Sequence, residues 1–394
     1  MRSFLPFLLV LFAIAAILRA DFAFVVAYLF FAVYLLSRLW LGRVAKNVSI
    51  RRRFTPRAFF GDEVKVEVQI ENAGRLPIPW LAVHESLSVE LTAPPFRKHV
   101  FSLGPRERRH FNYDLHCRKR GYYPLGPLTA STGDLLGIED RDLGQFAPDY
   151  LIVYPRTVPL ERLGLPTRSP LVALPARSPL FEDPARVIGV RDYQWGDSER
   201  RIHWTATASA GRLLVKQYQP SIARETLVCL DLNEESYDLR HRFDAAELAI
   251  VVAASIARHI VVRERLPAGL ATEALDARTD ARTRFFLPPR RERAQLMDVL
   301  EVLARAQMAP ATPFPEVLRR ESVRLAWGTT LAAITGRVSE DLFDTLAYLR
   351  RVGFAVALIL VQPGQLSAEL QKRAGLLGMP IHRLWRERDL EQWQ

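Results

Sequence analysis

The chain has 394 residues, more than one ordinary domain contains, so we expect two or three folded units. Hydrophobic residues make up 49% and charged residues 25% of the sequence, which excludes a chain that is disordered throughout. The net charge of +11 suggests nucleic-acid binding, but nearly all the positive residues are arginines scattered among acids, and no recognition motif is present. We therefore expect no nucleic-acid partner. The two cysteines, Cys117 and Cys229, are far apart, which predicts buried apolar residues in a reducing compartment rather than a disulfide or metal site.

The N-terminus holds two apolar runs, residues 3–18 and 22–36, separated by Arg19-Ala20-Asp21. Sixteen helical residues span about 24 Å, and the second run extends to Leu41 if Arg38 reaches the lipid interface. The apolar region of a signal peptide is shorter and is followed by a cleavage site, not by a second run. The pattern predicts a transmembrane helical hairpin over residues 1–42. One long broken helix and a re-entrant pair are the alternatives.

Basic residues determine the predicted orientation of this hairpin. Arg2 precedes the first run, and six basic residues follow the second: Arg38, Arg43, Lys46, Arg51, Arg52 and Arg53. The positive-inside rule places both ends, and the soluble domains, in the cytoplasm. We therefore expect a multi-pass protein of the cell inner (plasma) membrane. The same basic residues are expected to contact anionic lipid headgroups, which makes membrane lipid a partner.

Residues 47–140 show the alternation typical of strands. Val64, Val66, Val68 and Ile70 alternate with polar residues, and prolines and glycines separate further short runs. The spacing predicts a small β-sandwich, a spacer or interaction platform. Residues 133–138 predict a tight turn, because no Lys-Ser/Thr follows their glycines. Residues 141–224 are predicted to hold an extended connector, rich in proline and arginine over 155–184, and a distinctive block.

That block runs from Gly189 to Trp204 and concentrates Arg, Asp, Tyr, Trp and His in sixteen residues. Asp197 is expected to cap a turn or to pair with Arg191 or Arg201, and Tyr193 and Trp204 offer rings for a guanidinium. A structural clasp is the favoured interpretation. A ligand or partner site and a catalytic site are the alternatives, although His203 has no sequence-evident partner for catalysis.

At these residues the chain resembles the domain of unknown function 58 family, whose hallmark is Arg-x-Tyr-x-x-Gly-Asp-x-x-Arg-x-Ile-x-Trp followed by a Leu-x-Val-Lys strand. The matching residues are Arg191, Tyr193, Gly196, Asp197, Arg200 or Arg201, Ile202, Trp204, Val215 and Lys216. Ala208-Ser209 departs from the Ala-Arg pair that members often carry. The resemblance extends over almost the whole chain. It implies a bacterial, membrane-anchored protein with a von Willebrand factor A-like domain that works with MoxR-type AAA+ ATPases in chaperone-like assembly or envelope stress processes.

Residues 225–394 alternate apolar strands with helices, which predicts an α/β doubly wound, mostly parallel sheet. The order agrees with a von Willebrand factor A-like fold independently of the block. Strands are expected over 226–232, 268–272, 330–335, 354–361 and 381–385. Helices are expected over 243–265, 340–351 and 365–377, with a further helix near 290–305.

Ligands bind such sheets beyond the carboxyl ends of the strands. The residues expected there are Asp231, Asn233, Glu235, Thr272 and Thr335. Von Willebrand factor A domains hold Mg²⁺ with Asp-x-Ser-x-Ser, a Thr and a further Asp, all of them hard oxygen ligands. Here Asn233 and Glu235 replace the serines, and Thr335-Gly336 lacks the Asp. Two interpretations of this edge remain: it binds Mg²⁺, or it recognises partners or caps helices without metal.

Taken together, an anchor, a β spacer and an α/β domain without a complete catalytic set predict a non-enzymatic interaction protein. Its expected partner is a MoxR-type AAA+ ATPase. The alternative is a metal-dependent hydrolase that uses Asp231, Asn233 and Glu235, with His203 as base.

Overall fold

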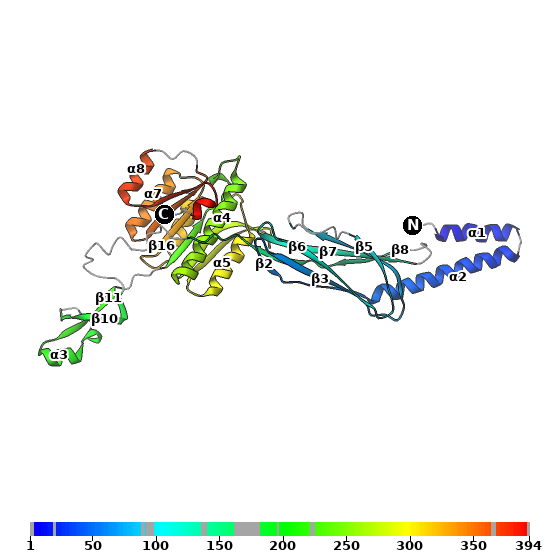
Figure 1. Ribbon diagram of the computed structural model, residues 1–394, viewed down its shortest axis with the longest axis horizontal. Coiled ribbons are helices and arrows are strands. Elements are labelled where there is room, and N and C mark those ends of the chain that lie inside the picture. The colour runs from blue at the N-terminus through cyan, green and yellow to red at the C-terminus, as the bar shows by residue number, and fades with distance from the viewer. Residues whose placement is uncertain are drawn as a thin grey trace. The chain divides into compact units, whose positions relative to one another are not determined.

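The computed structural model of the chain describes residues 4–18, 21–87, 91, 98–134, 140–160, 182–194, 197–220, 225–363 and 368–391. The chain divides into two compact units, Met1–Arg156 and Thr157–Gln394. Figure 1 shows helices α1 and α2 and the β-strands of the first unit, and the α/β sheet of the second. Each unit is described by itself.

Two apolar helices begin the first unit, α1 (Phe4–Leu18) and α2 (Asp21–Val44). They lie side by side, because the ring of Phe7 is 6.3 Å from that of Phe30 and the ring of Phe12 is 5.5 Å from that of Tyr28. Most of their large apolar side chains are exposed, including Ile17, Val25 and Leu36. Residues 21–47 are long and apolar enough to span a membrane; residues 242–264 pass the same test but are mostly buried in the α/β unit.

Two β-sheets make up the rest of the first unit. The three-stranded sheet has the order β1 (Val48–Arg53), β3 (Glu63–Asn72), β6 (Arg108–His116). The six-stranded sheet has the order β2 (Arg57–Phe59), β9 (Asp149–Tyr154), β7 (Gly121–Gly133), β4 (Ile78–Leu87), β5 (Lys98–Leu103), and β8 (Asp140–Phe146) also pairs with β7. Their apolar faces share one core, to which β3 contributes its alternating valines.

The predicted boundary of this module at residue 140 is too early, since β8 and β9 lie beyond it and both pair with β7. Most of the turn expected over 133–138, and the connector over 161–181, lie outside the described residues.

The expected contact of Arg52 with lipid is not observed. Its side chain is 4% exposed and pairs with Glu85 at 2.7 Å inside the module, because β1 directs it toward the core.

The second unit contains a mostly parallel sheet with helices, as the alternation of apolar runs predicted. Its order is β14 (Ala281–Arg290), β13 (Ala268–Asp276), β12 (Thr226–Leu230), β16 (Thr330–Thr335), β17 (Ala355–Val361), β18 (Ile381–Leu384); the two-residue β15 (Ala306–Gln307) pairs with β13. Strands β12, β13, β16, β17 and β18 are parallel and β14 is antiparallel. The carboxyl ends of the five parallel strands therefore meet at one edge.

Helices cover both faces of this sheet, as Figure 1 shows. Helix α4 (Arg242–Arg258), which continues as a π-helix to Glu264, and α5 (Arg293–Arg305) lie on one face. The other face buries side chains of α6 (Phe314–Ser322), α7 (Glu340–Val352) and α8 (Ala368–Leu377). Residues 157–160 lie along α4, where the amide of Val158 donates to Ser255 Oγ at 2.9 Å. The sequence did not predict β14 or α6.

The block that precedes the α/β sheet forms its own small element. Strands β10 (Glu182–Asp192) and β11 (Leu214–Pro220) pair antiparallel. Between them lie a 3-10 turn, Glu199–Arg201, and the short helix α3 (Trp204–Ala210).

Candidate functional site at the carboxyl edge of the sheet

Asp231 follows β12 directly and is buried, with 3% of its surface exposed. Its Oδ1 accepts from the amide of Asn233 at 3.0 Å, and its Oδ2 accepts from the Thr335 hydroxyl at 2.8 Å. Thr335 ends β16, the neighbour of β12, so the parallel register brings the two side chains together as the sequence predicted. The site thus begins with a carboxylate held between two strand ends.

The environment of this carboxylate is unfavourable for its charge. Burial raises the pKa of Asp231 to about 6, although hydrogen bonds from Ser236, Asn233 and Thr335 act in the opposite direction. Its partners are neutral, and it forms no ion pair with any of the residues that the structure describes. A buried carboxylate without a cation destabilises its fold, and such groups are common at functional sites.

Asn233 binds a loop rather than pointing to Asp231. Its Nδ2 donates to the carbonyl of Ala311 at 3.1 Å, and its Oδ1 accepts from the amides of Ala311 and Glu235 at 3.4 and 3.3 Å. Glu235 is exposed. Thr272 lies in the neighbouring strand β13, beside Leu230 of β12. Its buried hydroxyl has no hydrogen-bond partner among the residues described. Of the five predicted residues, the structure brings together Asp231 and Thr335, with Thr272 one strand away.

These residues do not fit a Mg²⁺ ion. Both oxygens of Asp231 and the side-chain oxygen of Asn233 are engaged within the protein, and in the described ranges no three His, Cys, Asp or Glu side chains gather as a metal-binding group. A side chain at position 336 has no room, since a Cβ there would lie 2.5 Å from Tyr237 Cδ1 and 2.7 Å from the Ser236 carbonyl oxygen. The ring of Tyr237 therefore leaves no room for a carboxylate at position 336.

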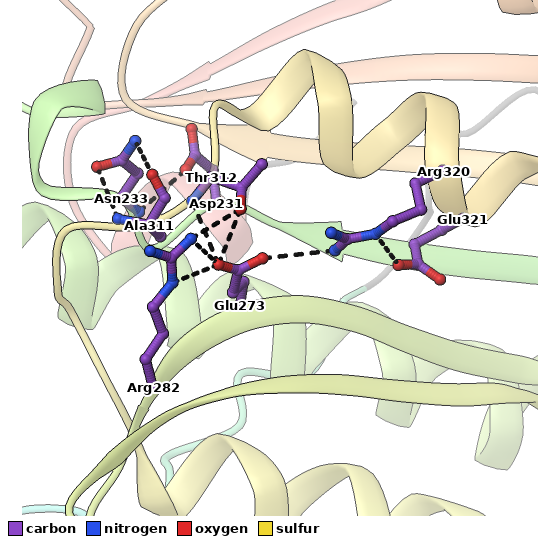
Figure 2. A network of polar contacts seen from close by, with 8 residues as sticks. All are labelled: Asp231, Asn233, Glu273, Arg282, Ala311, Thr312, Arg320 and Glu321. Carbon is purple, nitrogen blue, oxygen red and sulfur yellow. Dashed lines mark hydrogen bonds and ion pairs between the residues drawn. The ribbon is translucent and has the colours of Figure 1, made fainter.

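A network of acids and arginines lies beside this edge, and sequence reasoning missed it (Figure 2). Glu273, in β13, accepts from Arg282 Nε at 2.5 Å and from the Thr312 hydroxyl at 3.0 Å, and lies 3.4 Å from Arg320 Nη2. Arg320 also pairs with the buried Glu321 at 3.0 Å. Burial alone would raise the pKa of Glu273, but Arg282 and Thr312 bring it below its usual value. Thr312 follows Ala311, so this network supports the loop that Asn233 binds.

The block residues form a clasp that is only partly buried. Both oxygens of Asp197 accept from Arg191, each at 2.7 Å, and Oδ2 also accepts from the amide of Gln194 at 2.9 Å. Ile202 is buried and bridges Val215, and Lys216 lies in β11 beside Val190. Trp204 is 68% exposed, so its ring is largely open to solvent and is not buried within the clasp. Tyr193 and Arg201 lie in the same element, and Gly196 is outside the described residues.

Replacement of Asp197 by asparagine is expected to loosen this clasp. The hydrogen bonds from Arg191 and Gln194 lower the pKa of Asp197 to about 2, so the ionised clasp stabilises the folded element above about pH 4 and is lost as the pH falls through about 2. Hydrogen exchange of the Gln194 amide should be faster in Asp197→Asn at pH 4 and 7. Asp192→Asn, which removes an exposed pair with Arg212, is the control and should leave this exchange unchanged.

His203 has a structural contact in the same element. Its Nδ1 accepts from the amide of Ala206 at 3.2 Å and so caps α3. His203→Ala is expected to destabilise α3 by about 1 kcal/mol, while His203→Asn retains a capping oxygen. Amide exchange of residues 206–208 measures this effect. Equal exchange in wild type and His203→Ala would contradict the capping role.

A second concave surface lies at the opposite edge of the sheet, between α6 and α7. Its volume is about 740 Å³, and its lining includes Val323, Leu325, Trp327, Tyr348 and Val352. Trp327 Nε1 donates to the carbonyl of Val352 at 3.1 Å, which fixes one wall. The sequence analysis did not identify this surface, because its residues come from α6, α7 and the loop after α6, which meet only in the fold.

Comparisons with known proteins agree with the resemblance of the block. The family described as "Protein of unknown function DUF58" matches residues 189–368, which confirms the predicted resemblance over that range. A relative in Bacillus subtilis (strain 168), "Uncharacterized protein YeaD", is 25% identical over 299 residues, 72% of this chain and 68% of the relative.

Solved structures resemble only parts of the chain. The CARDB domain of the PF1109 protein from Pyrococcus furiosus is 16% identical over 27% of this chain and 86% of that chain, with a TM-score of 0.21. A fragment of alpha-2-macroglobulin from Escherichia coli is 19% identical over 32% of this chain and 21% of that chain, with a TM-score of 0.26.

Proposed function

We propose that the chain is a non-enzymatic, membrane-anchored interaction protein whose C-terminal domain is von Willebrand factor A-like and binds a partner at the carboxyl edge of its sheet. The support for the fold is the sheet order, with β12 central, an antiparallel β14 and helices on both faces. In this proposal Asp231 and Thr335 keep the positions that metal ligands have in such domains, but act without metal.

The exposed apolar surface of α1 and α2 supports the anchor. Side chains such as Ile17, Phe22 and Leu36 are more than half exposed, and lipid is the environment in which such helices are stable. We propose that the two helices form a transmembrane hairpin in the inner membrane of a bacterium. With the positive-inside rule, both units then lie in the cytoplasm.

The observation that carries the proposed interaction is the carboxylate of Asp231. It is buried, it has neutral hydrogen-bond partners, and its pKa is raised to about 6. A neutral residue at this position would make the fold more stable, so the presence of an acid favours a role in recognition over a role in folding. A lysine or arginine of a partner would supply the missing positive charge once the edge opens, because the carboxylate is 3% exposed in the unbound chain.

The partner we propose is a MoxR-type AAA+ ATPase, with assembly or envelope stress processes as the setting. The support is the resemblance of residues 189–216, which include the exposed Trp204. Tryptophan is among the residues that are enriched at the energetic hot spots of protein interfaces.

The direct test is recovery of the ATPase with the chain. The full-length chain, tagged and held in mild detergent, is mixed with the purified MoxR-type ATPase of the same organism in ADP and in a non-hydrolysable ATP analogue. We expect a stoichiometric complex in at least one nucleotide state. Elution of the chain alone in every state would contradict the proposal.

A further inference from the structure

We infer that the end of the first unit next to α2 binds the headgroups of anionic phospholipids through six basic residues that converge from four segments. We name this set the basic collar: Arg38, Arg43, Lys46, Arg75, Arg106 and Arg141. The inference rests on the proposed membrane anchor and adds to it a class of lipid and a surface.

Backbone contacts bring three of the segments together. The amide of Ala73 donates to the carbonyl of Asn47 at 2.9 Å, which places the turn that holds Arg75 beside Lys46. The amide of Arg106 donates to the carbonyl of Gly74 at 3.1 Å, so the next turn lies against the first. The collar therefore includes residues that are far apart in the sequence.

The fourth segment is β8. A Cβ built on Gly42, in α2, would lie 3.5 Å from Arg141 Nη1, so this guanidinium lies against the helix. All six collar side chains are exposed. The described residues give them no ion pair, and Arg38 donates only to the neutral Tyr34 hydroxyl, at 3.1 Å. The charges are therefore available to a ligand, although Asp140 and Asp142 flank Arg141.

The length of α2 brings the collar to the level of the headgroups. The β module begins to contact α2 at Ser37, whose hydroxyl donates to Asp134 at 2.5 Å, and Trp40 Nε1 donates to the carbonyl of Pro77 at 3.3 Å. Asp21 to Ser37 is about 24 Å of helix, and the hydrocarbon core is about 30 Å thick. A helix that is short for its bilayer draws its flanking groups into the interface.

Anionic lipid is the occupant that these observations favour. The collar is a cluster of six cations at the end of a helix that enters the bilayer, and such clusters attract anionic headgroups. A zwitterionic headgroup carries no net charge and would gain little from six cations.

The test uses the full chain reconstituted in phosphatidylcholine vesicles with traces of spin-labelled phosphatidylglycerol or spin-labelled phosphatidylcholine. The motion-restricted fraction of each label measures its association with the protein. We expect phosphatidylglycerol to associate about threefold or more strongly than phosphatidylcholine, and the ratio to fall toward one in 0.5 M salt.

Lys46→Gln/Arg75→Gln/Arg106→Gln/Arg141→Gln is expected to bring the ratio close to one. The matched control, Arg240→Gln/Arg263→Gln/Arg278→Gln/Arg291→Gln, removes four exposed charges of the α/β unit and should retain the wild-type ratio. A ratio of one in wild type, or an unchanged ratio in the collar variant, would overturn the inference. Flotation of the protein with the vesicles after alkaline carbonate distinguishes this result from failure of the anchor, because a protein without an anchor would not float.

Discussion

Gly336→Asp is expected to lower the free energy of unfolding of the α/β unit by about 3 kcal/mol or more, and to leave the protein unable to bind Mg²⁺. The new Cβ would lie 2.5 Å from Tyr237 Cδ1 and 2.7 Å from a backbone oxygen. Tyr237 cannot move aside freely, because it is buried and its hydroxyl donates to the carbonyl of Asp231 at 2.5 Å. A carboxylate placed directly after Thr335 therefore disrupts the edge instead of adding a metal ligand.

Native-state hydrogen exchange of the β12 and β16 amides measures this loss within the unit, and calorimetry measures Mg²⁺ binding. Gly375→Asp is the matched control, since Gly375 lies in α8 with nothing within 4 Å of its built Cβ, and it should change stability by less than about 0.5 kcal/mol. A Gly336→Asp protein with wild-type stability and bound Mg²⁺ would show that the edge is a metal site lacking one ligand.

Asp231→Asn is expected to raise the free energy of unfolding near pH 7 by as much as about 3 kcal/mol. The pKa of Asp231 is raised from 3.8 to about 6 by burial, so the folded state binds the proton more tightly than the unfolded state. The wild-type free energy of unfolding should fall as the pH rises from about 4 to about 6, and change little from this group above that. Asparagine removes the charge and with it this pH dependence.

The measurement is amide exchange of β12 between pH 4.5 and 7.5 in both proteins. Asp244→Asn, at an exposed position in the first turn of α4, controls for loss of a negative charge. An Asp231→Asn protein that is less stable than wild type near pH 7 would mean that the carboxylate stabilises the fold, and the argument for a recognition role would fail.

The strands of the α/β sheet could be predicted because they are continuous apolar runs bounded by polar residues. Asp231 and Thr335 could be placed at one edge for the same reason, since each directly follows such a run. Strand β14 was missed because Arg282, Arg284, Pro288 and Pro289 interrupt its apolar pattern. Helix α6 was missed because it has nine residues and begins next to prolines.

The chemistry of the edge could not be predicted from residue types alone. Asn233 and Glu235 have suitable oxygens, but one binds the 309–311 loop and the other is exposed. The ring of Tyr237 fills the space beside Gly336, and no rule of sequence spacing connects these two residues. The Glu273 network depends on β14 and α6, the two elements that the sequence did not predict. Likewise, Arg75 and Arg106 join the basic collar through two turns that lie against each other, and Arg141 joins it from β8.

The central claim is that Asp231 is retained for partner recognition at the expense of stability. The measurement that tests it most directly is the Kd of the purified MoxR-type ATPase for the full chain in detergent, compared among wild type, Asp231→Asn and Asp244→Asn. We expect Asp231→Asn to bind at least about tenfold more weakly, as loss of one desolvated charge contact predicts, and Asp244→Asn to bind as wild type does. Equal affinity in all three proteins, with Asp231→Asn the more stable, would contradict the claim.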